Sequence, residues 1–314
     1  MTSKARRCGW LLLAGLLLGQ TVLAAKPRTL PLRPVTTTTI WQGENDRALS
    51  LPTDVAVGAD GVLYVVDSGH DRVVMLDAGG GWLGAFGSSG DGEGQLDGPV
   101  GIGIDPASGT VYVADRRNDR LQTFSASGEF LRSLPVEADG KGAAPVDVAV
   151  RRDGSELYVS SAAAHRVLVL DPKGELLRQW GEQGDEPGQF HFPASIALAA
   201  GRVYVVDVLN ARIQSFDRNG GDARPIGKRG GGPGTFFRPK GLAIGADGTL
   251  FAGDSFFGVI QAFAPEGEFL YALGGDGKAR QLDDPVGMSA SGDGLLVVEM
   301  LAGRLQRLQL GAAP

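Results

Sequence analysis

Two stretches of the chain repeat one phrase: residues 110–124 read "TVYVADRRNDRLQTF", and residues 202–216 read "RVYVVDVLNARIQSF". Each copy holds two short runs rich in β-branched and aromatic residues, joined by a polar turn. This pattern is typical of two strands joined by a tight connection. Because the copies lie far apart in the chain, they indicate a fold built from repeated units.

The repeat has a regular period, which is marked by a proline before an apolar run. The six prolines are Pro52, Pro99, Pro145, Pro193, Pro239 and Pro285. They stand 46 to 48 residues apart, and each full unit holds four short apolar runs bounded by glycine or aspartate turns. A four-stranded unit of this length, repeated around an axis, is the blade of a β-propeller. The sequence therefore predicts an all-β fold, a six-bladed β-propeller.

The two ends of the chain complement each other. The sixth unit supplies only three runs, whereas "TTTTIWQG" at residues 36–43 is a strand that no unit claims. Pairing the two would cover two sheet edges. We therefore predict that the ring is closed by an N-terminal strand that completes the last blade.

The segment before this strand has the features of an export signal. Basic residues precede an apolar run at residues 10–18, and Val22 and Ala24 suit the positions before a cleavage point. An uncleaved membrane anchor is the alternative, but glycines break the run and a spanning helix needs about 20 apolar residues. We predict a signal peptide at residues 1–25, an extended lead-in at 26–35 and the propeller at 36–314. The protein would be periplasmic or secreted, with no stable membrane anchor after cleavage.

Charge and cysteine content exclude several classes of function. The formal net charge is −6, and it becomes more negative when the basic signal peptide is removed. Nucleic-acid binding depends on neutralising phosphates with Lys and Arg, so we expect no nucleic-acid partner. The one cysteine, Cys8, lies in the predicted signal peptide. Disulfide and thiol chemistry are therefore not expected in the mature chain.

The repeat resembles that of the NHL-repeat family. The resemblance rests on the period, on the opening motif in "GQFHFPASIAL" (188–198) and "GTFFRPKGLAI" (234–244), and on the core motif in "YVADRRNDR" and "YVVDVLNAR". It covers residues 36–314 and implies the same six-bladed fold. The Gly-His and Trp-Asp signature of WD40 propellers is absent from the sequence.

An acidic residue and an arginine recur five positions apart in the turn between the second and third runs. Four units have both residues, namely Asp67 with Arg72, Asp115 with Arg120, Asp207 with Arg212 and Glu299 with Arg304; the third unit has Ser161 before Arg166, and the fifth has Asp254 without the arginine. This spacing suits a carboxylate that accepts hydrogen bonds from turn amides and an arginine that holds the next loop in place. A catalytic group is needed once, so the repetition favours a structural role.

The fifth unit breaks this rule. It has Val259 in place of the arginine, it places Phe256 and Phe257 in the turn, and its preceding loop adds Phe237 and Lys240. Exposed aromatic residues clustered on one face are typical of partner-binding sites. We therefore predict a partner-binding site formed by Phe237, Lys240, Phe256 and Phe257. The alternative is that the rings pack between blades.

The position two residues after each repeat proline is expected to line the channel mouth. Its occupants are Asp54, Gly101, Asp147, Ser195, Gly241 and Gly287. Small residues suit strands that crowd around an axis, and Asp54, Asp147 and Ser195 are candidates to hold a cation or a polar ligand. Two carboxylates supply only part of the six to eight oxygens that Ca²⁺ takes. We therefore predict no cofactor and no metal site, with Ca²⁺ as the metal to test.

The histidines do not form a recognisable zinc set. His70 and His165 stand at different offsets in their turns, and His191 precedes a repeat proline. Amidating lyases related to the NHL family bind zinc through channel histidines, and these positions do not line up in one ring. No Ser-His-Asp spacing or phosphate-binding loop is present in the sequence. The sequence thus contains no catalytic set that can be recognised from spacing.

Two functions remain open. The first, which we favour, is a non-enzymatic monomeric binding or scaffold protein that engages a protein, a peptide or an envelope polymer through its top face. The second is a metal-assisted lyase or lactonase, like other six-bladed propellers, with Asp54 and Asp147 at the channel mouth.

Overall fold

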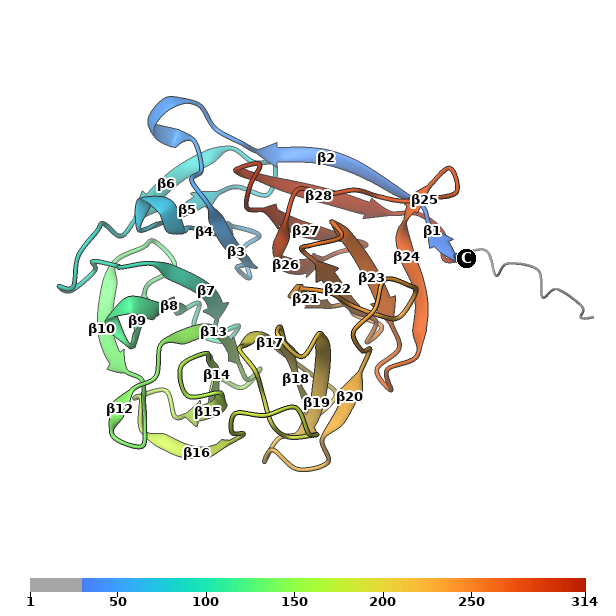
Figure 1. The fold of residues 1–314 in the computed structure, drawn as a ribbon. Coiled ribbons are helices and arrows are strands. Elements are labelled where there is room, and N and C mark those ends of the chain that lie inside the picture. Colours follow the sequence, from blue (N-terminus) through green and yellow to red (C-terminus); the bar gives the residue numbers. More distant parts are fainter. Residues whose placement is uncertain (1–29) are drawn as a thin grey trace, which may run out of the picture.

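The computed structural model describes residues 30–314, and the predicted signal peptide lies outside the described residues. Six sheets surround a central axis (Figure 1), so the predicted six-bladed β-propeller is confirmed. The helical segments of the described residues are three short 3-10 turns, η1 (Asn45–Arg47), η2 (Ser68–His70) and η3 (Arg116–Asn118). From residue 30 onward, no helix has the length and hydrophobicity needed to cross a bilayer.

Each blade is an antiparallel sheet of four strands. Blade one holds β3 (Pro52–Val57), β4 (Leu63–Asp67), β5 (Arg72–Leu76) and β6 (Trp82–Phe86); blade two holds β7 (Pro99–Ile104), β8 (Val111–Asp115), β9 (Arg120–Phe124) and β10 (Phe130–Pro135); blade three holds β13 (Pro145–Val150), β14 (Leu157–Ser161), β15 (Arg166–Leu170) and β16 (Leu176–Trp180).

Blades four to six follow the same order. Blade four holds β17 (Pro193–Ala199), β18 (Arg202–Asp207), β19 (Arg212–Asp217) and β20 (Arg224–Ile226); blade five holds β21 (Pro239–Ile244), β22 (Leu250–Asp254), β23 (Val259–Phe263) and β24 (Phe269–Gly275); blade six holds β26 (Pro285–Ser291), β27 (Gly294–Glu299), β28 (Arg304–Leu310) and β2 (Val35–Trp41). Two short additions are the hairpin of β11 (Glu137–Ala138) with β12 (Lys141–Gly142), and β25 (Lys278–Ala279) beside β24.

The first strand of every blade begins at a repeat proline and lies next to the channel. Each of these strands contacts the first strand of the blade on either side, so that the six form an inner ring. Proline lacks the amide hydrogen that a sheet interior would require, and a strand's first residue tolerates that loss. The period of the prolines is therefore the period of the inner strands.

The N-terminal strand β2 is the outermost strand of blade six. It pairs antiparallel with the C-terminal strand β28, from Val35 opposite Leu310 to Trp41 opposite Leu305 (Figure 1). Trp41 and Ile40 pack on the apolar cluster that blades six and one share, and the Trp41 ring lies 5.8 Å from that of Trp82. Strands β2 and β28, from opposite ends of the repeat region, thus belong to one sheet.

The lead-in segment contains a further strand that the sequence did not predict. Strand β1 (Leu32–Arg33) pairs in parallel with β24 at the outer edge of blade five. The amide of Ala272 donates to the carbonyl of Pro31 at 3.0 Å, and Arg33 donates to the Tyr271 hydroxyl at 2.8 Å. The chain therefore runs from blade five into blade six before the first repeat begins.

The recurring acidic residue and arginine form the predicted structural tie. In blade two, one oxygen of Asp115 accepts a bond from the amide of Asp97 and the other accepts one from Arg120, both at 2.7 Å. In blade three, where Ser161 replaces the aspartate, Arg166 pairs at 2.7 Å with Asp139. In both blades, the tie holds the segment that enters the blade against the turn between its second and third strands.

Candidate functional site

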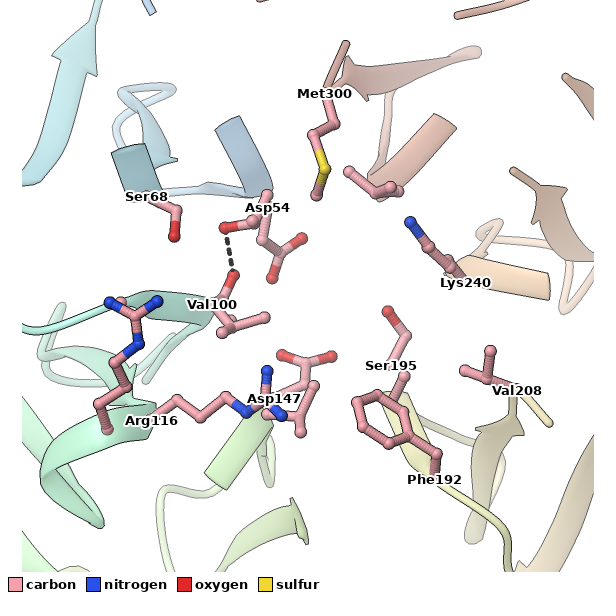
Figure 2. Close-up of a pocket in the computed structure, with 17 residues that line it drawn as sticks. Asp54, Ser68, Val100, Arg116, Asp147, Phe192, Ser195, Val208, Lys240 and Met300 are labelled. Atoms are coloured by element: carbon pink, nitrogen blue, oxygen red, sulfur yellow. Dashed lines mark hydrogen bonds between the residues drawn. The ribbon is translucent and has the colours of Figure 1, made fainter. Parts of the chain in front are cut away.

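A cavity of about 360 Å³ opens at one end of the central channel, on the face that carries the turns between second and third strands (Figure 2). We call this face the top face and this space the central cavity. Three rings line it, each taking equivalent residues from several blades. They are the residue after the repeat proline (Thr53, Val100, Val146, Ala194, Lys240, Val286), the next residue (Asp54, Gly101, Asp147, Ser195) and the residue after the acidic turn residue (Ser68, Arg116, Val208, Met300).

The second ring is the floor of the central cavity. A second space of about 310 Å³ continues along the channel, and Asp54, Asp147 and Ser195 line both spaces. The structure thus places all three residues where the central cavity meets the channel. Figure 2 shows both carboxyl groups directed toward the channel axis.

Each aspartate of the floor connects two blades. Asp54 accepts a bond from its neighbouring amide in blade one (2.9 Å) and one from the Ile102 amide in blade two (3.0 Å). Asp147 does the same, with 2.7 Å to the Val148 amide in blade three and 2.9 Å to the Ile196 amide in blade four. Both carboxyl groups are therefore held in fixed positions.

Glycine at neighbouring positions of the ring leaves room for the aspartates. A Cβ added to Gly101 would lie 2.5 Å from the Cα of Asp147, and one added to Gly287 would lie 2.4 Å from the Cα of Asp54. Contacts that short with backbone atoms require the strands to move apart. The ring thus has no space for a side chain at these two positions.

Both carboxyl groups resist ionisation. Burial raises the pKa of Asp54 well above its ordinary value, and repulsion from Asp147 raises it further. Burial also raises the pKa of Asp147 to about 6, against the opposing effect of its two amide bonds. Within residues 30–314, no cationic side chain contributes to either shift. The floor of the cavity therefore favours a bound proton or another positive charge.

The raised pKa values predict that these carboxyl groups favour the folded state most at low pH. The folded protein keeps their protons where the unfolded chain, with an ordinary aspartate pKa near 3.8, releases them. This contribution is present below pH about 4 and is lost as the pH rises through about 6. We expect the stability of the wild type relative to Asp147→Asn to fall by on the order of 1–3 kcal/mol over that window, measured by urea unfolding.

The matched control for that measurement is Asp153→Asn. Asp153 is an exposed aspartate whose pKa is lowered by bonds from Ser155. Its ionised form therefore favours the folded state, so the wild type should gain stability relative to this variant as the pH rises. A wild-type advantage over Asp147→Asn that stays constant from pH 4 to 7 would contradict the predicted shift.

Positive charge lies at the rim of the central cavity. The guanidinium of Arg116 lies over the Phe192 ring, 5.4 Å from its centroid, and Figure 2 shows its side chain extending toward the channel axis. Lys240 lines the opposite side and lies 3.3 Å from Asp284. Phe192, Val208 and Met300 add apolar surface. The cavity thus has an acidic floor, a basic rim and partly apolar walls.

The donor set at the floor does not fit a Ca²⁺ ion. The side chains on offer are two carboxylates and the hydroxyl of Ser195, and each carboxylate oxygen already accepts an amide bond. Ca²⁺ takes six to eight oxygen ligands. Within residues 30–314, no group of three or more acidic, histidine or cysteine side chains is arranged to hold a metal.

The four residues predicted to bind a partner fall into two places. Phe237, Phe256 and Phe257 form one aromatic cluster, with ring centroids 4.2 to 6.2 Å apart, and Phe237 and Phe256 are exposed. Lys240 is the fourth, and it lines the central cavity instead of this cluster. The third ring, Phe257, is half-buried and lines a separate cavity.

Two of the three histidines meet in a way that the sequence did not indicate. The rings of His165 and His191, from blades three and four, lie 5.8 Å apart. Burial and repulsion from His191 lower the pKa of His165. His70 lies in blade one, where its ring is 2.9 Å from Asp67. The three histidines thus occupy two separate places.

Sequence reasoning missed most of the cavity wall. Arg116 and Met300 each come directly after the recurring acidic turn residue of their repeat. The residue at this next position differs from blade to blade. That variation beside a constant position is the signal that could have identified the third ring. Phe192 precedes a repeat proline, and nothing in the sequence indicated that its ring lines the cavity.

Comparison with known proteins agrees with this architecture. Residues 96–124, from the end of a blade-entering loop through β9, match the family model described as NHL repeat. The chain contains an NHL repeat. That match includes the stretch "TVYVADRRNDRLQTF", so the predicted resemblance is confirmed there. Among curated proteins, none is similar enough in sequence to match this chain.

Solved structures share the fold at low sequence identity. A virginiamycin B lyase from Staphylococcus aureus has a TM-score of 0.62 at 11% identity, covering 91% of this chain and 97% of that one. A gluconolactonase from Xanthomonas campestris has a TM-score of 0.66 at 17% identity, covering 88% and 90%. A protein of unknown function from Bacteroides thetaiotaomicron has a TM-score of 0.69 at 13% identity, covering 89% and 76%.

Proposed function

We propose that the protein is a binding protein that takes the amino-terminal end of a peptide into the central cavity. The observation that carries this proposal is the pair of carboxyl groups at the floor, Asp54 and Asp147, with raised pKa values and no cationic partner among the described residues. An ammonium group would supply the missing positive charge. It also brings three hydrogen-bond donors, which two carboxylates and the Ser195 hydroxyl can accept.

The rest of the cavity suits the atoms that follow a peptide's ammonium group. Arg116 and Lys240 at the rim are donors for peptide carbonyls or for an acidic side chain. Phe192, Val208 and Met300 provide contact for an apolar side chain. A volume of about 360 Å³ is at the small end of ligand pockets, which favours one or two residues inside and the remainder of the peptide across the top face. The predicted export signal would bring the protein to peptides outside the cytoplasm.

Calorimetric titration with a short apolar peptide tests this proposal. The peptide with a free amino terminus should bind at pH 7, and its N-acetylated form should bind at least about tenfold more weakly, since a charge-assisted bond contributes about 1.5–3 kcal/mol. Asp147→Asn should weaken binding of the free peptide similarly, whereas Asp153→Asn should not. Equal affinity for the free and acetylated peptides would exclude the ammonium site.

An enzyme of the lyase or lactonase type is the second candidate. The structural neighbours that carry these names support it at the level of the fold, and a buried aspartate whose pKa lies near 6 is suited to proton transfer. The assay is incubation with cyclic esters, followed by mass spectrometry. Turnover that Asp147→Asn abolishes, while Asp153→Asn retains it, would favour the enzyme over the binding protein.

A further inference from the structure

In blade two, an arginine fills the space between the third strand and the loop that enters the blade. Arg120 donates to the carbonyl of Asp91 at 2.7 Å and to the carbonyls of Gly92 and Gln95 at 2.9 Å each. Its Nε donates to Asp115 at 2.7 Å. The guanidinium thus connects three loop carbonyls to the buried acidic residue.

Blade four repeats this arrangement. Arg212 donates to the carbonyls of Asp185, Glu186 and Gln189 at 2.7, 2.9 and 2.9 Å, and its Nε donates to Asp207 at 2.9 Å. All three bonds in each blade go to main-chain carbonyls, and the middle one is on Gly92 in blade two but on Glu186 in blade four, so the backbone itself forms the guanidinium site.

Blade five keeps the loop but lacks the arginine. Gln261 accepts a bond from the Gly234 amide and donates to the Thr235 carbonyl, each at 2.8 Å. Gln214 holds the loop of blade four with the same two bonds. Val259 stands at the first position of the third strand, where the other blades have arginine. The loop carbonyls are therefore set as in blade four, with no guanidinium from the same blade.

A cavity of about 340 Å³ lies at this place. We call it the blade-five cavity. Its lining includes Val259, Gln261 and Phe257, together with the three loop residues whose counterparts hold Arg120, namely Gly231, Gly232 and Thr235. No charged side chain of the described residues lines it. The space that an arginine occupies in blades two and four is open in blade five.

Two carbonyls of this cavity can accept further bonds. The carbonyl of Gly232 already accepts from the amide of Thr235 at 3.1 Å and from its hydroxyl at 2.7 Å. Among residues 30–314, the carbonyl of Thr235 accepts a bond from Gln261 alone, and that of Gly231 accepts none. Each of these two carbonyls has a lone pair for a donor that enters the cavity.

The acidic residue of blade five also lacks its usual cation. Asp254 is fully buried and accepts bonds only from backbone amides, those of Phe237, Arg238, Phe256 and Phe257. Its counterparts in blades two and four each pair with an arginine. Positive charge near this cavity would therefore be favourable, although no side chain in residues 30–314 forms an ion pair with Asp254.

Phe257 gives the blade-five cavity an aromatic wall. It stands at the position of Asn210 in blade four and lies in the exposed aromatic cluster, 5.3 Å from the Phe256 ring. Cations bind over aromatic faces, and planar guanidinium groups also stack on them. Blade five thus has Val259 in place of the arginine and Phe257 in place of the asparagine. Two loop carbonyls, those of Gly231 and Thr235, then line the same cavity as an aromatic ring.

We propose that the blade-five cavity binds the side chain of an arginine residue in a partner polypeptide. Arginine fits better than lysine because its planar, multiply donating group matches two carbonyls and a ring, and because arginine fills the equivalent site in blades two and four. Lys278 and Arg280 flank the cavity but do not line it. This site is separate from the central cavity and does not depend on the function proposed for it.

The test is an NMR titration of the protein with acetyl-Gly-Arg-Gly-amide and with the same peptide carrying citrulline. Both peptides lack the free amino terminus proposed to bind in the central cavity, and shifts at the residues of the blade-five cavity distinguish this site from the acidic floor. The arginine peptide should shift the amide signals of Gly231 and Gly232, and the uncharged citrulline peptide should bind at least about tenfold more weakly. Equal binding of the two peptides, or shifts confined to other residues, would overturn the proposal.

Val259→Arg provides the matched variant, because it places in blade five the residue that the other blades have. It should raise the melting temperature and abolish binding of the arginine peptide. Unchanged peptide affinity in a folded Val259→Arg protein would overturn the site. Phe257→Ala is the second variant: it removes the aromatic wall without adding charge, and affinity that stays at the wild-type value would exclude Phe257 from the site.

Discussion

A chain that begins at Gln42 should be less stable than the protein by several kcal/mol. It lacks β2, so the whole outer edge of β28 loses its partner, and the apolar cluster between blades six and one loses Ile40 and Trp41. Removing a fully buried large ring costs about 3–5 kcal/mol, and the partly buried Trp41 contributes part of that amount. The open edge of β28 should also promote aggregation. Thermal unfolding and light scattering measure both effects.

A chain that begins at Pro34 is the control for this truncation. It lacks β1, which pairs with only two residues of β24, but it retains β2 and the cluster around Trp41. Its melting temperature should therefore lie close to that of the longer chain. If the chains beginning at Pro34 and Gln42 melt at the same temperature, β2 does not stabilise the ring.

The fold could be predicted because its signals are local and repeated. The inner strand begins at a proline in every blade, and the polar turn after the second strand recurs with the same spacing. Six copies make such a pattern clear even when single copies vary. Strand β1 had no such support, because Leu32 and Arg33 form a two-residue strand whose pairing with β24 depends on residues about 240 positions away.

The candidate sites could be predicted only in part, because each combines positions from several repeats. Asp54 and Asp147 were identified since they share one offset from the proline. Arg116 was missed because its offset is counted from a different residue of the repeat. Lys240 was grouped with Phe237 because they are near in sequence, but it lies on strand β21, whose first residues line the channel, while Phe237 precedes the strand.

The blade-five cavity, too, could be predicted only in part from the sequence. The sequence revealed that Val259 breaks the arginine rule and that phenylalanines replace the polar turn residues. It could not reveal that the entering loop keeps its shape without the arginine. That shape is held by Gln261, which bonds to both Gly234 and Thr235, and these contacts join segments about 26 residues apart.

Arg212→Ala should produce the second large loss of stability. Arg212 is 9% exposed, and its removal takes one donor from each of three loop carbonyls and leaves the fully buried carboxylate of Asp207 without its cation. The carbonyls of Glu186 and Gln189 keep bonds from Gln189 and Gln214, so that of Asp185 loses most. Burial already raises the pKa of Asp207, against the lowering effect of its bonds and of Arg212. Removing one partner of a buried ion pair typically costs about 3–5 kcal/mol, which urea unfolding at pH 7 would measure.

The double variant Arg212→Ala with Asp207→Asn separates the charge from the loop contacts. An amide needs no cation, so the double variant should recover part of the loss, while the loop carbonyls still lack the bonds that Arg212 donated. Arg224→Ala is the control, because that arginine pairs with Asp222 at the surface, where solvent weakens the interaction. If Arg212→Ala were as stable as Arg224→Ala, the repeated arginine would not stabilise the blade, and a role in binding would have to explain why it recurs.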